Sequence, residues 1–106
     1  MYLPDIFKKF VQRHGEVSEA YRKVGELCSD GGPLDLKTQH LIQLAVATGA
    51  SSKGGVGSHA RRALDAGATE EEVFQTILLS MTLIGFPAMI AAYGWADAVV
   101  SARTTE

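Results

Sequence analysis

Apolar residues recur at steps of three and four along most of this chain, which is the spacing of the buried face of a helix. One such stripe runs over Ile6–Cys28 and predicts one helix, or two helices hinged at Gly15. Gly31-Gly32-Pro33 then ends the helical pattern. Two more stripes lie within Val73–Ile84 and Pro87–Val99, and no segment alternates with the two-residue period of a strand. The pattern therefore predicts an all-α fold.

Capping residues predict where the middle helices begin and end. Asp35 can cap a second helix, and Ser51 or Ser52 can cap a third. Gly67 suits the left-handed position that commonly ends a helix. Thr69–Glu72 is a capping box, in which a threonine and a glutamate three residues apart each bond the other's backbone N–H.

The stretch from Ile77 to Trp95 contains no formal charge and is long enough to span the core of a bilayer. Gly85 and Pro87 interrupt it near the middle, where Gly-Phe-Pro reads as a turn with Pro87 at the first position of the following helix. We therefore expect two shorter helices buried in protein, and no membrane partner.

Composition narrows the possible partners. The formal net charge is −2 and no block of basic residues appears, which argues against nucleic acid as the main partner. The length of 106 residues predicts one domain over residues 1–106. Cys28 is the only cysteine, so neither an internal disulfide nor a CxxC redox pair can form within one chain. The first residues lack the long apolar core of a signal peptide, so we expect a cytoplasmic protein.

The most informative stretch is Leu41–Val73, which reads LIQLAVATGASSKGGVGSHARRALDAGATEEEV. Together with LDLKTQHLIQLAVAT and LIGFPA, it resembles the carboxymuconolactone decarboxylase family, whose superfamily includes the alkylhydroperoxidase D proteins. The resemblance covers about Asp35 to Gly94. It implies an alkylhydroperoxidase D-like, all-α bundle of about five or six helices that forms a homo-oligomer, usually a trimer or hexamer. It also implies a small-molecule pocket near His59, and we expect no cofactor.

In the redox members of that superfamily a CxxC pair sits three residues before the matching histidine. Counting back from His59 puts the two thiol positions at Ser52 and Gly55, so the histidine is kept and both thiols are absent. A thiol peroxidase needs one thiolate to attack the peroxide and a second thiol to resolve the product. We therefore expect no thiol-dependent peroxidase activity. The decarboxylase members also lack a thiol pair, so the resemblance to them is the closer one on this point.

His59 is the main candidate for chemistry. It lies beside the apolar stripe of its helix, and imidazole titrates near neutrality, which suits general acid or base catalysis, although the same pattern fits a histidine that only packs. His40 stands where the redox relatives have a glutamate that serves with the histidine as a proton relay. If the two helices form an antiparallel hairpin, both histidines can face one pocket, and we assign His40 an orienting role. No carboxylate or thiol at ligand spacing completes a zinc site, so no metal is expected.

Other residues are candidates for contact with a small acid. Four come from the glycine-rich loop, the helix of His40 and a segment that borders the pocket in the family: Ser52, Gly55, Gln43 and Phe86. Three more could pair with a carboxylate: Lys37, Gln39 and Arg62.

Two function classes follow. In the first, the chain is a decarboxylase-like lyase or isomerase that acts on a small carboxylated or lactone-type molecule with His59 as acid or base. In the second, it is an alkylhydroperoxidase-like relative that has lost its redox thiols and serves as a non-catalytic oligomeric binding module.

Overall fold

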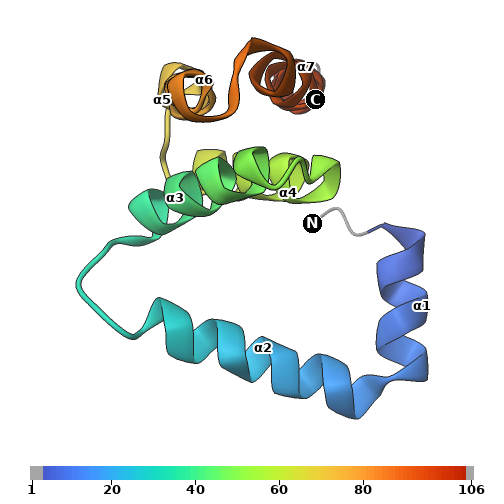
Figure 1. The fold of residues 1–106 in the computed structure, drawn as a ribbon. Coiled ribbons are helices and arrows are strands. Elements are labelled where there is room, and N and C mark those ends of the chain that lie inside the picture. Colours follow the sequence, from blue (N-terminus) through green and yellow to red (C-terminus); the bar gives the residue numbers. More distant parts are fainter. Residues whose placement is uncertain (1–3, 105–106) are drawn as a thin grey trace. The chain divides into compact units, whose positions relative to one another are not determined.

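A computed structural model of the chain describes residues 4–104. The chain divides into two compact units, of which the first ends at Pro33 and the second begins at Leu34 (Figure 1). Each unit is described by itself below. That both belong to one domain over residues 1–106 stays a prediction.

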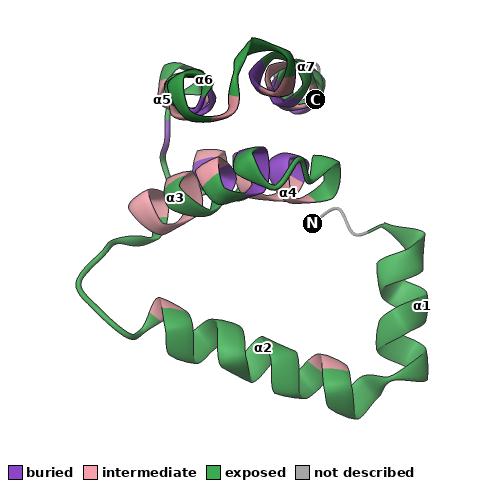
Figure 2. Cartoon of the chain, in the orientation of Figure 1, coloured by how far each residue is buried: buried purple, intermediate pink, exposed green. Residues whose placement is uncertain are grey.

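The first unit consists of α1 (Asp5–Arg13) and α2 (Gly15–Ser29). The break between them falls on His14, whose φ of −130° and ψ of 59° are not helical, one residue before the hinge predicted at Gly15. Neither helix has a buried residue (Figure 2). Large apolar side chains are exposed along both: Ile6, Phe7, Phe10, Val11, Val17, Tyr21, Val24 and Leu27. The described part of this unit therefore has no core of its own.

The second unit is a bundle of five helices: α3 (Leu36–Gly49), α4 (Lys53–Asp65), α5 (Glu70–Leu79), α6 (Met81–Ile84) and α7 (Phe86–Thr104). The predicted all-α fold is confirmed, because residues 4–104 form helices and connecting turns without a strand. They contain six longer helices and the single turn of α6, against the five or six helices expected.

The predicted caps of α3 and α4 are present. The carboxylate of Asp35 accepts a hydrogen bond from the backbone N–H of Thr38 at 2.8 Å, at the start of α3. The hydroxyl of Ser52 accepts one from the backbone N–H of Gly55 at 3.0 Å, at the start of α4. Each cap satisfies a backbone donor that has no partner inside its helix.

The capping box opens α5 as predicted. Glu72 N–H donates to the Thr69 hydroxyl at 3.0 Å, and Thr69 N–H donates to a carboxylate oxygen of Glu72 at 2.9 Å. The other carboxylate oxygen of Glu72 accepts from the ammonium of Lys37 at 3.0 Å, which ties the start of α5 to the start of α3. Gly67, before the box, has a φ of +102°, a conformation that favours glycine.

Small and branched side chains form the core of this unit. Its fully buried members come from α3, α4, α5 and α7: Leu44, Val56, Ala60, Ala63, Val73, Ile77, Ala92 and Ala96. At the ends of α4 and α7, Asp65 and Arg103 form an ion pair of 3.0 Å. The core holds α3 and α4 in a fixed register, and the position of the site depends on that register.

The charge-free stretch is divided among three helices. Ser80 separates α5 from α6, and Gly85, with a φ of +90°, separates α6 from α7. Pro87 is the second residue of α7 and not the first as predicted. None of the helices described over residues 4–104 is both long and apolar enough to cross a membrane.

Candidate functional site

Two histidines meet on the hairpin of α3 and α4. Nδ1 of His40 lies 3.4 Å from Nδ1 of His59, and the two ring planes are inclined by 29°. Both side chains are partly buried. The helices are joined by three residues, and Ala47 lies against Gly55 near that connection, so α3 and α4 run antiparallel (Figure 1). The structure thus brings together the two residues that the sequence suggests as catalytic, while their catalytic role stays a prediction.

The surroundings of the pair favour neutral rings. Burial lowers the pKa of both His40 and His59 below the usual 6.5, because it disfavours the charged form. The Arg62 guanidinium lowers both pKa values further, and His40 adds to this effect on His59. A hydrogen bond with Gln43 acts in the opposite direction on His40. At neutral pH both imidazoles are therefore mainly neutral and able to accept a proton.

The lowered pKa values predict that acid destabilises the fold. Below about pH 6.5 the unfolded histidines bind protons more readily than His40 and His59 do in the folded chain, so acid favours unfolding. This stability is present above pH 6.5 and is lost as the pH falls through the folded pKa values. Asp35 and Glu72 also have lowered pKa values, but from 3.8 and 4.5, so their contributions are lost only in stronger acid.

Urea denaturation between about pH 7 and pH 5.5 isolates the histidine contribution. We expect the free energy of unfolding to fall across this window. In a double variant, His40→Gln with His59→Asn, the free energy of unfolding should change much less across the same window. The same pH dependence in the double variant would contradict the assignment.

Ser52 and Gly55, which stand where the redox relatives carry thiols, both have a structural role at the start of α4. The Ser52 hydroxyl is used as the helix cap. A Cβ on Gly55 would lie 2.9 Å from Cβ of Ala47 and 2.9 Å from Oγ of Ser52, closer than real side chains approach. Glycine at this position therefore permits α3 and α4 to pack closely. The predicted contact of Ser52 and Gly55 with a substrate is a separate role and stays a prediction.

Adjacent glycines in α4 provide a matched test of this packing. Gly55→Ala should lower the free energy of unfolding by about 1–3 kcal/mol, because the added methyl group overpacks the contact with Ala47. A Cβ on Gly54 meets nothing within 4 Å, so Gly54→Ala should stabilise by about 0.5–1 kcal/mol through helix propensity. Urea denaturation measures both, and equal stabilities would rule out the packing argument.

That Phe86 borders the pocket of the histidine pair stays a prediction. Phe86 begins α7, and its side chain is about half exposed. Val99, thirteen residues later, is the α7 residue that lies beside Gly57 in α4. Thirteen residues of helix rise about 20 Å, so Phe86 lies about that far along α7 from Val99.

An apolar groove of about 360 Å³ lies elsewhere on this unit. Its lining comes from α3, α5 and α6: Thr38, Leu41, Ile42, Ala45, Gly49, Thr76, Leu79, Ser80, Leu83 and Ile84. Neither His40 nor His59 is part of that lining. The sequence analysis did not predict the groove, although apolar residues on more than one side of Val73–Ile84 are a signal for it.

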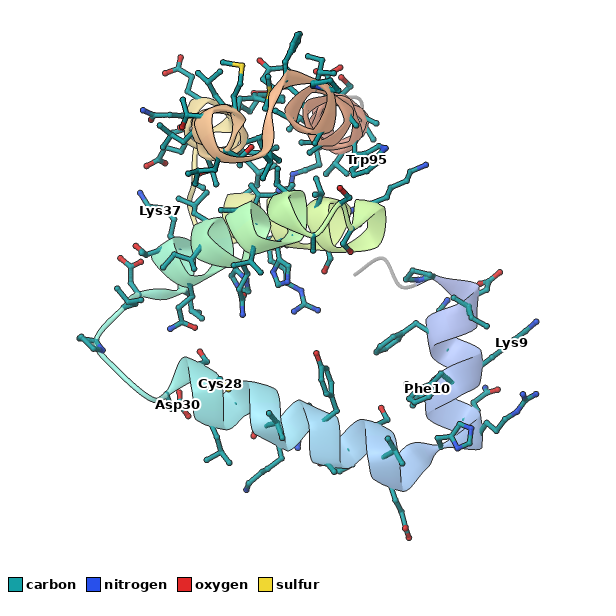
Figure 3. The ribbon with its side chains drawn as sticks, viewed as in Figure 1. Lys9, Phe10, Cys28, Asp30, Lys37 and Trp95 are labelled. Atoms are coloured by element: carbon teal, nitrogen blue, oxygen red, sulfur yellow. The ribbon has the colours of Figure 1, made fainter. Side chains whose placement is uncertain are left out.

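The three candidates for a carboxylate partner differ in the structure. The ammonium of Lys37, which Figure 3 labels, already pairs with Glu72, and the side-chain amide of Gln39 donates to the backbone oxygen of Leu34 at 2.8 Å. Arg62 is exposed, acts on both histidines, and forms no ion pair with a carboxylate of residues 4–104. Of the three, Arg62 is the one whose charge acts on both histidines, and its contact with an acid stays a prediction.

A metal cluster is not evident at the site. Within the described part of the chain, no group of three or more histidine, cysteine, aspartate or glutamate side chains is placed to hold a metal ion.

Comparison with known proteins agrees with this fold. The sequence profile of the carboxymuconolactone decarboxylase family matches residues 15–98. The chain is similar to the crystal structure of an apo carboxymuconolactone decarboxylase family protein from Legionella pneumophila, with a TM-score of 0.79 and 25% identity over 90% of this chain and 85% of that one. No curated protein matches the sequence. Because the family profile covers most of its length, the chain belongs to the carboxymuconolactone decarboxylase family.

Proposed function

We propose that the protein binds a small carboxylated or lactone-type molecule and converts it as a lyase or isomerase, with His59 as general acid or base. The observation that carries this proposal is the meeting of the two imidazoles, with 3.4 Å between their Nδ1 atoms, on helices held by a buried core. A neutral imidazole with an orienting partner is the usual form of a proton-transfer group in an enzyme.

Arg62 gives the proposed site a means of binding an acid. It lies one helical turn after His59, and its charge already acts on both histidines. A bound carboxylate would offset that charge, so it would bring the pKa of His59 back toward 6.5. The base would then be strongest when the substrate is present.

The alternative is a non-catalytic binding module that has lost its redox thiols. It is favoured by the structural use of both former thiol positions, since Ser52 caps α4 and Gly55 allows close packing. This alternative keeps the binding of a small molecule and gives up proton transfer by His59.

A thermal-shift screen with small mono- and dicarboxylates and lactones tests the binding that the proposal needs. A ligand at 100 times its Kd should stabilise the fold by about 2.7 kcal/mol. Arg62→Gln should remove the shift, while Lys53→Gln, which removes a positive charge from the same helix, should leave it in place. If no carboxylate or lactone raises Tm, the proposed substrate class is wrong.

We also propose that the protein works as a homo-oligomer, a trimer or hexamer, in the cytoplasm. The assembly is supported by large apolar side chains that stay exposed in each unit. The cytoplasmic location is supported by a single cysteine, Cys28, which has no partner for a disulfide within the chain.

A further inference from the structure

We propose that α2 of one copy of the chain lies in the apolar groove of a second copy, between its α3, α5 and α6. This contact rests on the assembly proposed above and makes it more specific, because it names the two surfaces that meet. It does not depend on a catalytic role for His59. Each copy carries both surfaces, so two copies can exchange the contact or several can repeat it around a ring.

One face of α2 is apolar and free of formal charge along most of the helix. Four residues at steps of four, three and four share this face: Val17, Tyr21, Val24 and Cys28. The charged residues of α2 lie off this face, and there the Arg22 guanidinium pairs with the carboxylates of Glu19 and Glu26. An apolar partner that covers the face therefore removes no charged group from water.

The groove is equally poor in charge. Its residues from α3 recur at the steps of one helix face: Thr38, Leu41, Ile42, Ala45 and Gly49. No formal charge occurs in α3 between Thr38 and Gly49, or in the chain between Val73 and Trp95, which includes the lining from α5 and α6. The hydroxyl groups of Thr76 and Ser80 donate to backbone oxygens of α5. The groove therefore matches an uncharged apolar helix face better than a charged ligand.

The lengths of the two surfaces agree. Cys28 lies eleven residues after Val17, and Gly49 lies eleven residues after Thr38. At about 1.5 Å per residue, each surface is about 16 Å long. The apolar residues of α1 extend over only about 8 Å, so α1 would leave half of the groove open. Binding of an amphipathic helix through residues at such steps is a common way to fill an apolar groove.

Both surfaces need a partner, and a second copy supplies it. Large side chains of the α2 face and of the groove stay exposed in the single chain: Val17, Tyr21, Val24, Ile42, Leu79 and Leu83. Burying them against each other removes apolar surface from water on both sides of the contact. Every copy brings one α2 and one groove, so the two surfaces are always present in equal number.

The single cysteine makes a cross-linking test possible. Cys28 ends the α2 face and is exposed (Figure 3), so a thiol in the groove should form a disulfide with it when the full chain is oxidised with copper phenanthroline. Ile42→Cys, Leu79→Cys and Leu83→Cys each place a thiol at an exposed position on a different helix of the groove. At least one should give a covalent pair of chains on a non-reducing gel. Lys53→Cys, outside the lining, is the control and should give none.

The outcomes separate this contact from the assembly and from the small-molecule function. Adding Cys28→Ser should abolish the link, which excludes a disulfide between two groove cysteines. A disulfide within one chain would overturn the proposal, and so would a mass of several chains with no link from any groove cysteine. A mass of one chain would contradict the assembly itself. A failed ligand screen would count against the small-molecule function alone.

A charge in the groove gives a second test without cysteine chemistry. Leu79→Glu should lower the mass toward one chain, because its carboxylate would be buried against α2 of the partner copy. Leu79 is exposed in the single chain, so the variant should keep its helical circular dichroism. Lys53→Glu, the same new charge outside the groove, should keep the mass. An unchanged mass in Leu79→Glu would contradict the proposed contact.

Discussion

Light scattering at micromolar concentration should give a mass several times that of one 11.3 kDa chain. The expectation rests on the large apolar side chains that are exposed in each of the two units. A mass equal to one chain would contradict the proposed assembly.

The exposed apolar surface explains why assembly is expected. The first unit exposes a stripe on each helix, and the second exposes large side chains on α3, α5, α6 and α7: Leu36, Ile42, Val46, Leu78, Leu79, Met81, Leu83, Phe86 and Ile90. Large exposed apolar side chains in such number are typical of interaction surfaces in soluble proteins. In a solution of the purified protein, only other copies of the chain can cover this surface, so we expect self-association.

The stripe on α2 allows a directed test. Val17, Tyr21 and Val24 share one face of α2. Val17→Glu combined with Val24→Glu should lower the mass toward one chain, because two buried charges would oppose the contact. Lys23→Glu, which lies off that face of the same helix, is the matched control and should keep the mass.

Cys28 reports on the same face independently. It lies near the end of α2 (Figure 3), and its thiol is exposed in the single chain. A thiol reagent should react slowly with Cys28 in the assembly and faster in the double glutamate variant. Equally fast reaction in both would show that this face is not covered.

The starts of three helices could be predicted from sequence because they depend on hydrogen bonds between residues close together in the chain. The caps at Asp35 and Ser52 and the capping box at Thr69 depend on residues three apart, so they can be recognised without knowing the tertiary structure. The hinge in the first unit was displaced by one residue. Glycine permits a break but does not require one at its own position, and the non-helical residue is His14, directly before it.

The site was harder to predict because it depends on packing between helices. The sequence indicates His40 and His59 as candidates, yet only the register of α3 against α4 sets 3.4 Å between their Nδ1 atoms. The need for glycine at position 55 likewise arises from Ala47 on the neighbouring helix. The apolar groove joins residues from three helices, so no single stretch of sequence shows it.

His59→Asn should be the most damaging substitution for turnover of the carboxylate identified by the ligand screen. General acid or base groups contribute roughly 10²–10⁴-fold to rate, so kcat/KM should fall by that factor, or about 3–5 kcal/mol of barrier. His40→Gln should cost less, because an amide at position 40 can still form a hydrogen bond with Nδ1 of His59. His14→Asn, the same kind of change in the first unit, should leave kcat/KM unaltered. The mass of each variant should match the original assembly, so that lost turnover reports on chemistry alone. Unchanged turnover in His59→Asn would exclude the catalytic role and leave the binding module as the function of this chain.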